Sequence, residues 1–416
     1  MRRTAASWMW MTFPLNLALG PLSTLVTLEV LSLGGNAIDV SYVITLGNLT
    51  TIPASLIWGM AADRFDRRKI VLLSFGATSI VLISFPFLDS IPALAGLYGT
   101  ITFITVAPNT PFNLFVMETN EKSKWASAFS RLSMLSSLGV LAGLLASSVG
   151  VIFLRVPYII EGLGVVVLIS TAAGLRVLPK PAVRLERVAL VHHKESFMTR
   201  LKMFPLFFLH LPDPSHFKMF RLSRLRTKPV NFVPLLYIAI FLFYLSSGLF
   251  NTVYPVSLYQ GGLNKAEVLG VITAGMIVQT VSFMETGWVI RKLGEQKSAS
   301  LSLALRAISY AGIAVVTAVA AGIPILAAGL TLYPLAAGLA FAIYYAASNT
   351  LVFKVVGERS HGRGLGVYST MTGVALFMGS LASGYLSHYV GFYLDFGAAA
   401  ILLFAASYMF HYLEEG

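Results

Sequence analysis

Only a few residues inside the apolar stretches of this chain carry groups that could bind a small molecule or react with it. Two are ionisable, Glu285 and Arg306, and each lies well within an apolar run. The others are uncharged polar side chains, which we predict to line a substrate cavity: Asn16, Asn48, Asn109, Asn113, Asn251, Gln279, Tyr344 and Asn349. Amides and phenols exchange hydrogen bonds without carrying charge at neutral pH. Such a set suits a neutral or amphipathic solute better than a strongly charged one.

The residue patterns of enzymes are missing from the sequence. The chain has no cysteine, which excludes disulfides, thiolate metal ligands and cysteine nucleophiles. It has no G-x4-G-K-[ST] loop for nucleotide phosphates. No His-x3-His or Glu-x2-His pair stands within an apolar run to hold a metal ion. We therefore predict no enzymatic activity, no metal site and no cofactor.

A small share of charged residues decides the class of protein. Of the 416 residues, 12% are charged and 56% are hydrophobic, whereas soluble proteins carry about 25% charged residues. So little polar surface cannot coat a water-facing globule, which leaves a multi-spanning helical membrane protein. The net charge of +12 could indicate nucleic-acid binding. However, the basic residues lie in short patches between apolar runs, as membrane topology requires, so we predict no nucleic-acid partner.

Apolar runs of spanning length predict an all-α membrane protein with 12 transmembrane helices. Six runs precede a polar stretch and six follow it, so we expect two pseudo-symmetric six-helix bundles. The predicted spans are 8–31, 39–62, 70–88, 92–117, 127–150, 157–178, 232–258, 267–290, 298–320, 324–350, 365–386 and 391–412. The corresponding domains are an N-terminal bundle over 1–178, a basic linker over 179–231 and a C-terminal bundle over 232–416.

Lysine and arginine predict which helix ends face the cytoplasm. With the N-terminus inside, 27 of the 30 basic residues fall on the cytoplasmic side, and only Arg155, Lys265 and Arg306 do not. This bias follows the positive-inside rule. We therefore expect a multi-pass protein of the cell membrane with both termini in the cytoplasm, and we expect it to be a monomer.

The linker 179–231 is strongly basic. It holds 11 basic residues against Glu186, Glu195 and Asp213, a net charge of +8. Phenylalanine and leucine recur in it at near-helical spacing from Phe197 to Leu211. This combination predicts an amphipathic helix lying on the anionic inner leaflet of the bilayer. Binding of nucleic acid or of a soluble regulator by the linker is the alternative.

A charged turn recurs at equivalent places in the two halves. The first copy reads Gly59-x3-Asp63-Arg64-x2-Arg67-Arg68. The second begins at Gly287 and has Arg291 at the place of Asp63. Self-similarity of this kind indicates two parallel halves joined by the linker.

The first copy resembles the signature G-x3-D-R-x-G-R-R of the major facilitator superfamily, with Asp66 at the place of the usual glycine. The resemblance covers the whole chain, because the motif stands on the expected loop of a six-plus-six arrangement. It implies a secondary transporter in which two halves rock around a central site. It also implies a cytoplasmic gate at the residues of the motif, Gly59, Asp63, Arg64, Arg67 and Arg68.

The signatures of drug/proton antiporters and of sugar porters are absent, so the subfamily stays open. The expected partner is a small-molecule substrate, and proton coupling is one of the options for driving its transport. The alternative function is a transport-inactive membrane sensor or scaffold that signals through the basic linker.

We expect Glu285 and Arg306 to form an ion pair. A lone charge inside the bilayer costs about 2.5–3.5 kcal/mol on insertion scales. The hairpin that turns near Gly294 places both residues at similar depth, so their long side chains could meet. The pair would act either as a structural clamp or as the site of proton coupling.

Prolines and glycines predict which helices bend and which slide. Prolines recur in the first run of each three-run unit: Pro14 and Pro21, Pro108 and Pro111, Pro234 and Pro255, Pro324 and Pro334. Glycines recur in the fifth and eleventh runs: Gly139, Gly143, Gly373, Gly379 and Gly384. Proline bends a helix where it borders water or moves, and glycine lets two helices approach closely. Ordinary proline enrichment of membrane helices and simple packing are the alternatives.

Overall fold

The structure is a computed structural model that describes residues 7–120, 125–179, 232–356 and 361–412. The predicted amphipathic helix of the linker lies outside the described residues. So do some side chains within helices, among them those of Asp63 and Arg64.

The N-terminal half is helical throughout its described residues. Its elements are η1 (Ser7–Met11), α1 (Thr12–Leu19), α2 (Leu22–Ser32), α3 (Ala37–Arg64), α4 (Arg67–Ile83), η2 (Phe85–Phe87), α5 (Ile91–Thr105), α6 (Asn109–Thr119), α7 (Trp125–Phe153) and α8 (Val156–Val177). The elements from η1 to α2 form one span, and α5 with α6 forms another.

The C-terminal half repeats this organisation. Its elements are α14 (Phe232–Gln260), α15 (Lys265–Leu293), α16 (Glu295–Val319), α17 (Ile323–Tyr333), the π-helix η6 (Pro334–Ala340), α18 (Phe341–Val356), α19 (His361–Tyr389) and α20 (Phe392–His411). Eleven segments of the described residues are long and apolar enough to cross a membrane. The helix α19, which is 29 residues long, stands at the place of the remaining predicted span. The predicted all-α fold of 12 spans is confirmed.

Three of the predicted prolines stand where a span is interrupted. Pro21 separates α1 from α2, Pro108 is the N-cap of α6, and Pro334 begins the π-helix η6. Proline lacks the amide hydrogen that would continue the helix, and its ring collides with the preceding turn. In contrast, α14 continues through Pro255.

The same start signal opens the second span of each half. Asn36 caps α3 and forms a capping box with Asp39. Asn264 caps α15 and forms a capping box with Glu267. Each box satisfies backbone amides that the first turn of a helix leaves without partners. The two halves therefore repeat at the level of single capping residues.

Glycine lets the first and fifth spans of each half approach closely. In the N-terminal half, a Cβ at Gly143 would collide with the Leu17 carbonyl oxygen of α1. In the C-terminal half, a Cβ at Gly379 would collide with the Leu245 carbonyl oxygen and lie 3.0 Å from Gly248 Cα, both on α14. The close helix contact expected from these glycines is confirmed.

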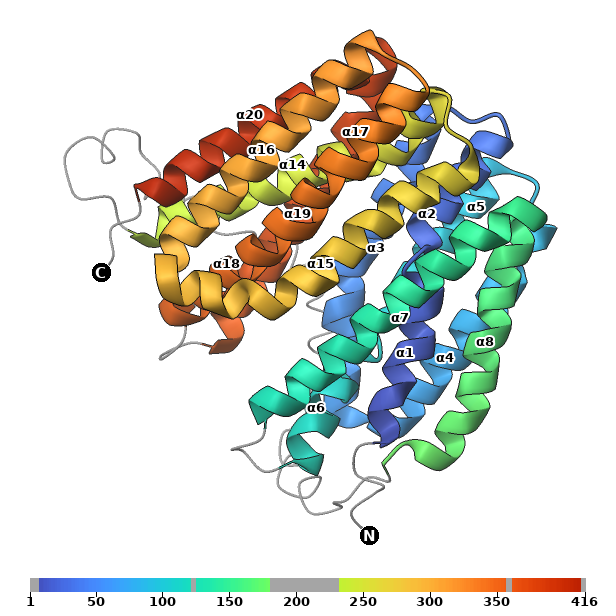
Figure 1. The fold of residues 1–416 in the computed structure, drawn as a ribbon. Helices are drawn as coiled ribbons and strands as arrows, with labels where there is room; N and C mark the ends of the chain where they lie inside the picture. The colour runs from blue at the N-terminus through green and yellow to red at the C-terminus, as the bar shows by residue number, and fades with distance from the viewer. Residues whose placement is uncertain (1–6, 121–124, 180–231, 357–360, 413–416) are drawn as a thin grey trace.

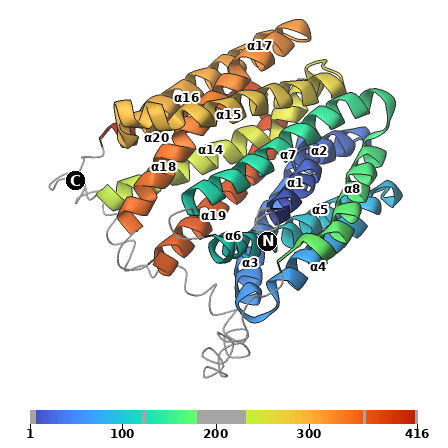
Figure 2. The same ribbon diagram turned by 60° about the horizontal axis from the view of Figure 1, so that its bottom comes forward.

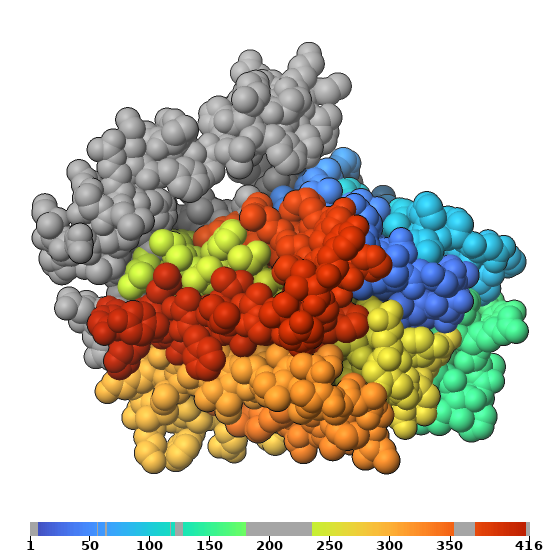
Figure 3. Space-filling view, turned by 90° about the horizontal axis from the view of Figure 1, so that it is seen from above, coloured from blue at the N-terminus to red at the C-terminus, as the bar shows by residue number. Residues whose placement is uncertain are grey.

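The two halves lie side by side and meet along two helix pairs. The helix α3 packs against α19, and α7 packs against α15. Viewed from above, the red and yellow helices of the C-terminal half lie directly against the blue and green helices of the N-terminal half (Figure 3). We call the end of the molecule where η1 begins and α20 finishes the terminal end. The opposite end, with the connections 33–36, 154–155, 261–264 and 390–391, is the far end.

Candidate gating motif and substrate path

The charged turn between α3 and α4 lies at the terminal end. Asp66 is the N-cap of α4, and its Oδ1 accepts a hydrogen bond from the Arg68 amide at 3.0 Å. Aspartate is among the best N-cap residues because its carboxylate satisfies a free amide of the first turn. This explains how the chain tolerates Asp66 where the family signature has glycine.

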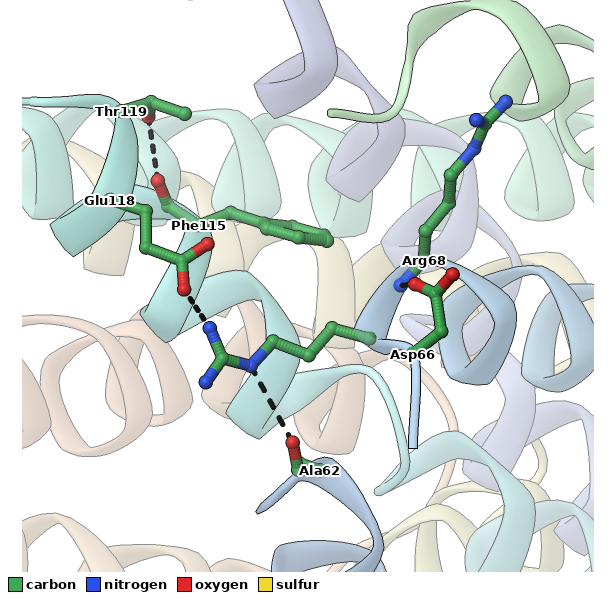
Figure 4. Close-up of polar contacts among 7 residues, drawn as sticks. Ala62, Asp66, Arg68, Phe115, Glu118 and Thr119 are labelled. Carbon is green, nitrogen blue, oxygen red and sulfur yellow. Dashed lines mark hydrogen bonds and ion pairs between the residues drawn. The ribbon is translucent and has the colours of Figure 1, made fainter. Parts of the chain in front are cut away.

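Two arginines in the first turn of α4 tie this helix to three others of the N-terminal half. Arg67 pairs with Glu118 near the end of α6, and its Nε donates to the Ala62 carbonyl of α3 at 3.5 Å (Figure 4). Arg68 donates through Nη2 to the Leu175 carbonyl in the last turn of α8. In this conformation these guanidinium groups therefore bind within their own half. The predicted contacts of Asp63 and Arg64 fall on undescribed side chains and stay predictions.

Glu118 is a motif partner that sequence reasoning did not find. It lies near the end of the fourth span, on the membrane face that also carries the charged turn. An acidic residue at that position was the available signal, because a carboxylate beside a cluster of arginines is a ready ion-pair partner.

At the far end, uncharged contacts join α3 of one half to α19 of the other. Ser41 donates to the Ser380 carbonyl, and Thr45 donates to Ser380 Oγ at 2.9 Å. The hydroxyls of Tyr42 and Tyr385 share a hydrogen bond. A Cβ at Gly384 would collide with Ser41 Cβ. We call this set of contacts the far-end seal.

The helices α2, α7 and α15 extend contacts between the halves at the same end. Lys265 Nζ donates to Ser32 Oγ at 2.6 Å, and Ser148 Oγ donates to the Ala266 carbonyl at 3.3 Å. Among the described residues, the hydrogen bonds between the halves thus gather at the far end. In contrast, a Cβ on Gly59, which lies on the terminal half of α3, would meet no atom of the described residues within 4 Å.

Among the predicted cavity residues, Asn251 has the clearest position. All residues of α14 from 246 to 258 are buried except Asn251, which is exposed. Asn109 and Asn113 are also exposed, on α6. An amide facing lipid would lack hydrogen-bond partners, so these positions are candidates for a water-filled path.

The remaining predicted cavity residues have other surroundings. Asn16 donates to the Thr12 carbonyl of its own helix at 2.8 Å. Asn48 belongs to the far-end seal, because its Nδ2 lies 3.3 Å from Ser380 Oγ. Gln279 and Asn349 are half-buried. Tyr344 is buried, with its ring centroid 4.0 Å from that of Phe243.

A hollow of about 260 Å³ lies between α3 and α5. It is lined by Leu46, Thr50, Gly96, Gly99, Thr100 and Phe103. None of the predicted cavity residues lines it.

Arg306 lies near the middle of α16 and is 2% exposed. Its Nε and Nη2 donate to the Tyr310 hydroxyl at 3.0 and 2.7 Å. Its guanidinium carbon lies 5.0 Å from the Phe243 ring centroid and 5.6 Å from that of Phe341. Cation–π contacts of this kind stabilise a desolvated guanidinium.

The expected ion pair between Glu285 and Arg306 is not formed in the structure. Among the described residues the one ion pair joins Arg67 to Glu118, and the Glu285 side chain is exposed. The physical reason is a third helix: η6 and α18 pack against both α15 and α16, which contact each other less. Similar depth in the hairpin therefore does not bring the two side chains together.

The family model of the Major Facilitator Superfamily matches residues 6–233 and 236–415. The chain belongs to the Major Facilitator Superfamily. Membership in this superfamily identifies a secondary transporter and disfavours the sensor or scaffold.

Two solved structures of transporters align with nearly the whole of this chain. The nucleoside transporter NupG is 14% identical, with a TM-score of 0.72 over 98% of this chain and 99% of its own. A POT family transporter in complex with 5-aminolevulinic acid is 12% identical, with a TM-score of 0.69 over 98% and 95%. At such low identity these neighbours show the fold alone. No curated protein matches the chain by sequence.

Proposed function

We propose that this transporter moves a small neutral or amphipathic solute across the cell membrane by alternating access, and that the structure holds the state open to the cytoplasm. The observation that carries the proposal is the gathering of hydrogen bonds between the halves at the far end. At the terminal end, the described arginines of the gating motif bind within one half. In alternating access, halves that are joined at one end leave the central site open to the other.

The terminal end is the cytoplasmic one in this proposal. It carries the charged turn with Arg67 and Arg68, the end of α8 before the linker, and the first and last described residues, Ser7 and Tyr412. The positive-inside rule places such a face in the cytoplasm. Asn251 would then face the open path from α14, with Asn109 and Asn113 on the opposite half.

The natural absence of cysteine allows a direct test of sidedness. A single Asn251→Cys should react with a membrane-impermeant maleimide in inside-out vesicles and not in right-side-out vesicles. Leu154→Cys, at an exposed far-end position, is the matched control and should show the opposite sidedness. Labelling of Asn251→Cys from outside only would contradict the proposed state.

Transport itself is measured by uptake of radiolabelled solutes into proteoliposomes. A nucleoside and 5-aminolevulinic acid are reasonable first probes, because the names of the two structural neighbours mention these classes. We further propose a monomer without catalytic activity or cofactor. Uptake with and without an imposed pH gradient decides whether protons drive it.

A further inference from the structure

Arg306 carries a buried charge that no carboxylate of the described residues offsets. Its side chain is 2% exposed, and none of the described acidic groups lies within ion-pairing distance of it. A cation kept inside the membrane part of a protein is costly and is a functional-site candidate by default. The structural alternative is a clamp that holds α14, α16 and α18 together through the aromatic contacts.

The hydrogen-bond donors of the Arg306 guanidinium are not all paired with acceptors among the described residues. Nε and Nη2 are satisfied by the Tyr310 hydroxyl, and Nη2 additionally lies 3.5 Å from Ser247 Oγ. Nη1 is buried and has no hydrogen-bond partner among the described residues. Buried charged donors normally have acceptors, so the site lacks an acceptor that a ligand could supply.

The walls around this donor are aromatic. The guanidinium carbon lies 5.0 Å from the Phe243 centroid, 5.2 Å from the Tyr310 centroid and 5.6 Å from the Phe341 centroid. Rings at these distances stabilise the cation, and they also offer apolar surface to a molecule that approaches Nη1.

The cluster adjoins the accessible face of the C-terminal half. Ser247 stands one helical turn before the exposed Asn251 on α14. Phe341 is half-buried and follows directly on the π-helix η6, and it stacks on the exposed Tyr345 at 5.6 Å. π-helical segments are irregular and frequent at functional sites. A small rotation at η6 would move Phe341 and admit a ligand to Nη1.

We propose that Arg306 binds the carboxylate of an amphipathic monocarboxylate solute, whose apolar body packs on Phe243 and Phe341. The inference rests on the proposed transport function and names its substrate class. One guanidinium balances one negative charge, and its N–H groups fit a carboxylate. A phosphate dianion would leave a second charge buried and unpaired, which is strongly unfavourable.

The test measures thermal unfolding of the full-length protein in detergent with benzoate, octanoate, benzamide or inorganic phosphate. Benzamide matches benzoate in shape and lacks its charge. We expect saturating benzoate or octanoate to raise the melting temperature by about 5 °C, and benzamide and phosphate to leave it unchanged. Arg306→Gln should abolish the shift, whereas the control Arg176→Gln, which removes an exposed charge from α8, should retain it.

The same experiment separates the binding site from the clamp. Without ligand, Arg306→Gln should melt at the wild-type temperature or higher, because an unpaired buried charge is removed. If this variant does not fold, Arg306→Lys keeps the charge and should retain preference for benzoate over benzamide with a smaller shift. The proposal is overturned if neither monocarboxylate stabilises the wild type, if benzamide stabilises it equally, or if the shift survives in Arg306→Gln.

Failure here is distinguishable from failure of the transport proposal. Proteoliposomes that take up a solute while no monocarboxylate binds would refute only the substrate class. Binding at Arg306 without flux of any probe would leave the site and refute transport.

Discussion

The two ends of α3 differ in how they meet the other half. Towards the far end, α3 touches α19 so closely that Gly384 has no room for a side chain beside Ser41. Towards the terminal end, a Cβ on Gly59 of the candidate gating motif would meet no described atom within 4 Å. Among the described residues, α3 therefore contacts the other half closely beside Gly384 and leaves space beside Gly59.

This difference indicates how the transporter could change from one access state to the other. The far-end seal consists of hydroxyl, amide and glycine contacts, and hydrogen bonds between membrane helices average about 0.6 kcal/mol each. Such a seal is worth only a few kcal/mol, which solute binding can offset. Closing the terminal end would require the other half to approach Gly59 and would bring it near Arg67 and Arg68, which here bind within their own half.

The largest effect is expected from locking the far-end seal. The hydroxyl oxygens of Thr45 and Ser380 lie 2.9 Å apart, so Thr45→Cys with Ser380→Cys should form a disulfide under oxidation and abolish uptake until it is reduced. The control is Ser300→Cys with Ser407→Cys, whose hydroxyls lie 3.2 Å apart within one half. Its disulfide should leave uptake intact. Full uptake by the locked far-end pair would contradict alternating access through this seal.

A large effect is also expected at the gating motif. Asp63→Asn should lower the uptake rate about tenfold or more without changing expression, because the terminal gate loses charge-assisted hydrogen bonds worth about 1.5–3 kcal/mol. Asp66→Asn is the matched control three residues away. It should transport normally, because asparagine caps a helix as well as aspartate does. Equal uptake rates for the two variants would remove Asp63 from the gate.

A moderate effect on stability should distinguish the two glycines. Gly384→Ala must force α3 and α19 apart, and overpacking of this kind typically costs about 1–3 kcal/mol. Gly59→Ala adds a Cβ in open space and should stabilise the helix by about 0.5–1 kcal/mol. Thermal unfolding measures both. A lower melting temperature for Gly59→Ala would mean that this end of α3 is already packed in the resting protein.

The smallest effect is expected from the pair of Arg67 and Glu118. Their side chains are 26% and 42% exposed, and ion pairs exposed to water contribute about 0–1 kcal/mol. Glu118→Gln should therefore shift the melting temperature only slightly, and less so in high salt, because salt screens exposed charges. A double change, Arg67→Glu with Glu118→Arg, should melt close to the wild type. A shift as large as that of Gly384→Ala would show that the pair is a main support of the fold.

The twelve spans could be predicted because hydrophobicity alone determines where helices cross a membrane. The glycine contacts of Gly143, Gly379 and Gly384 could be predicted because small residues at helical spacing have few other uses. The depth of Glu285 and Arg306 followed from helix rise. The ion pair that we predicted from this depth does not form, because rotation about the helix axis and the insertion of α18 are set by packing between segments far apart in the chain.

The far-end seal was visible in the sequence only in part. Asn48 was predicted as a cavity residue, yet its amide contacts Ser380 across the interface. Serine and threonine side chains mostly return hydrogen bonds to their own helix, as Thr252 does to Gly248. A single sequence does not tell which hydroxyl instead accepts a hydrogen bond from the other half, as that of Ser380 does.

The buried charge of Arg306 would also make transport sensitive to the membrane potential. A unit charge that crosses the whole membrane potential exchanges about 2.3 kcal/mol per 100 mV, and a guanidinium that crosses part of the field during rocking exchanges that fraction. A bound anion would cancel the charge on the loaded step and leave the empty return step voltage-dependent. The cell's resting potential would then favour one orientation of the empty carrier, and so act on the direction of net flux without any coupling ion.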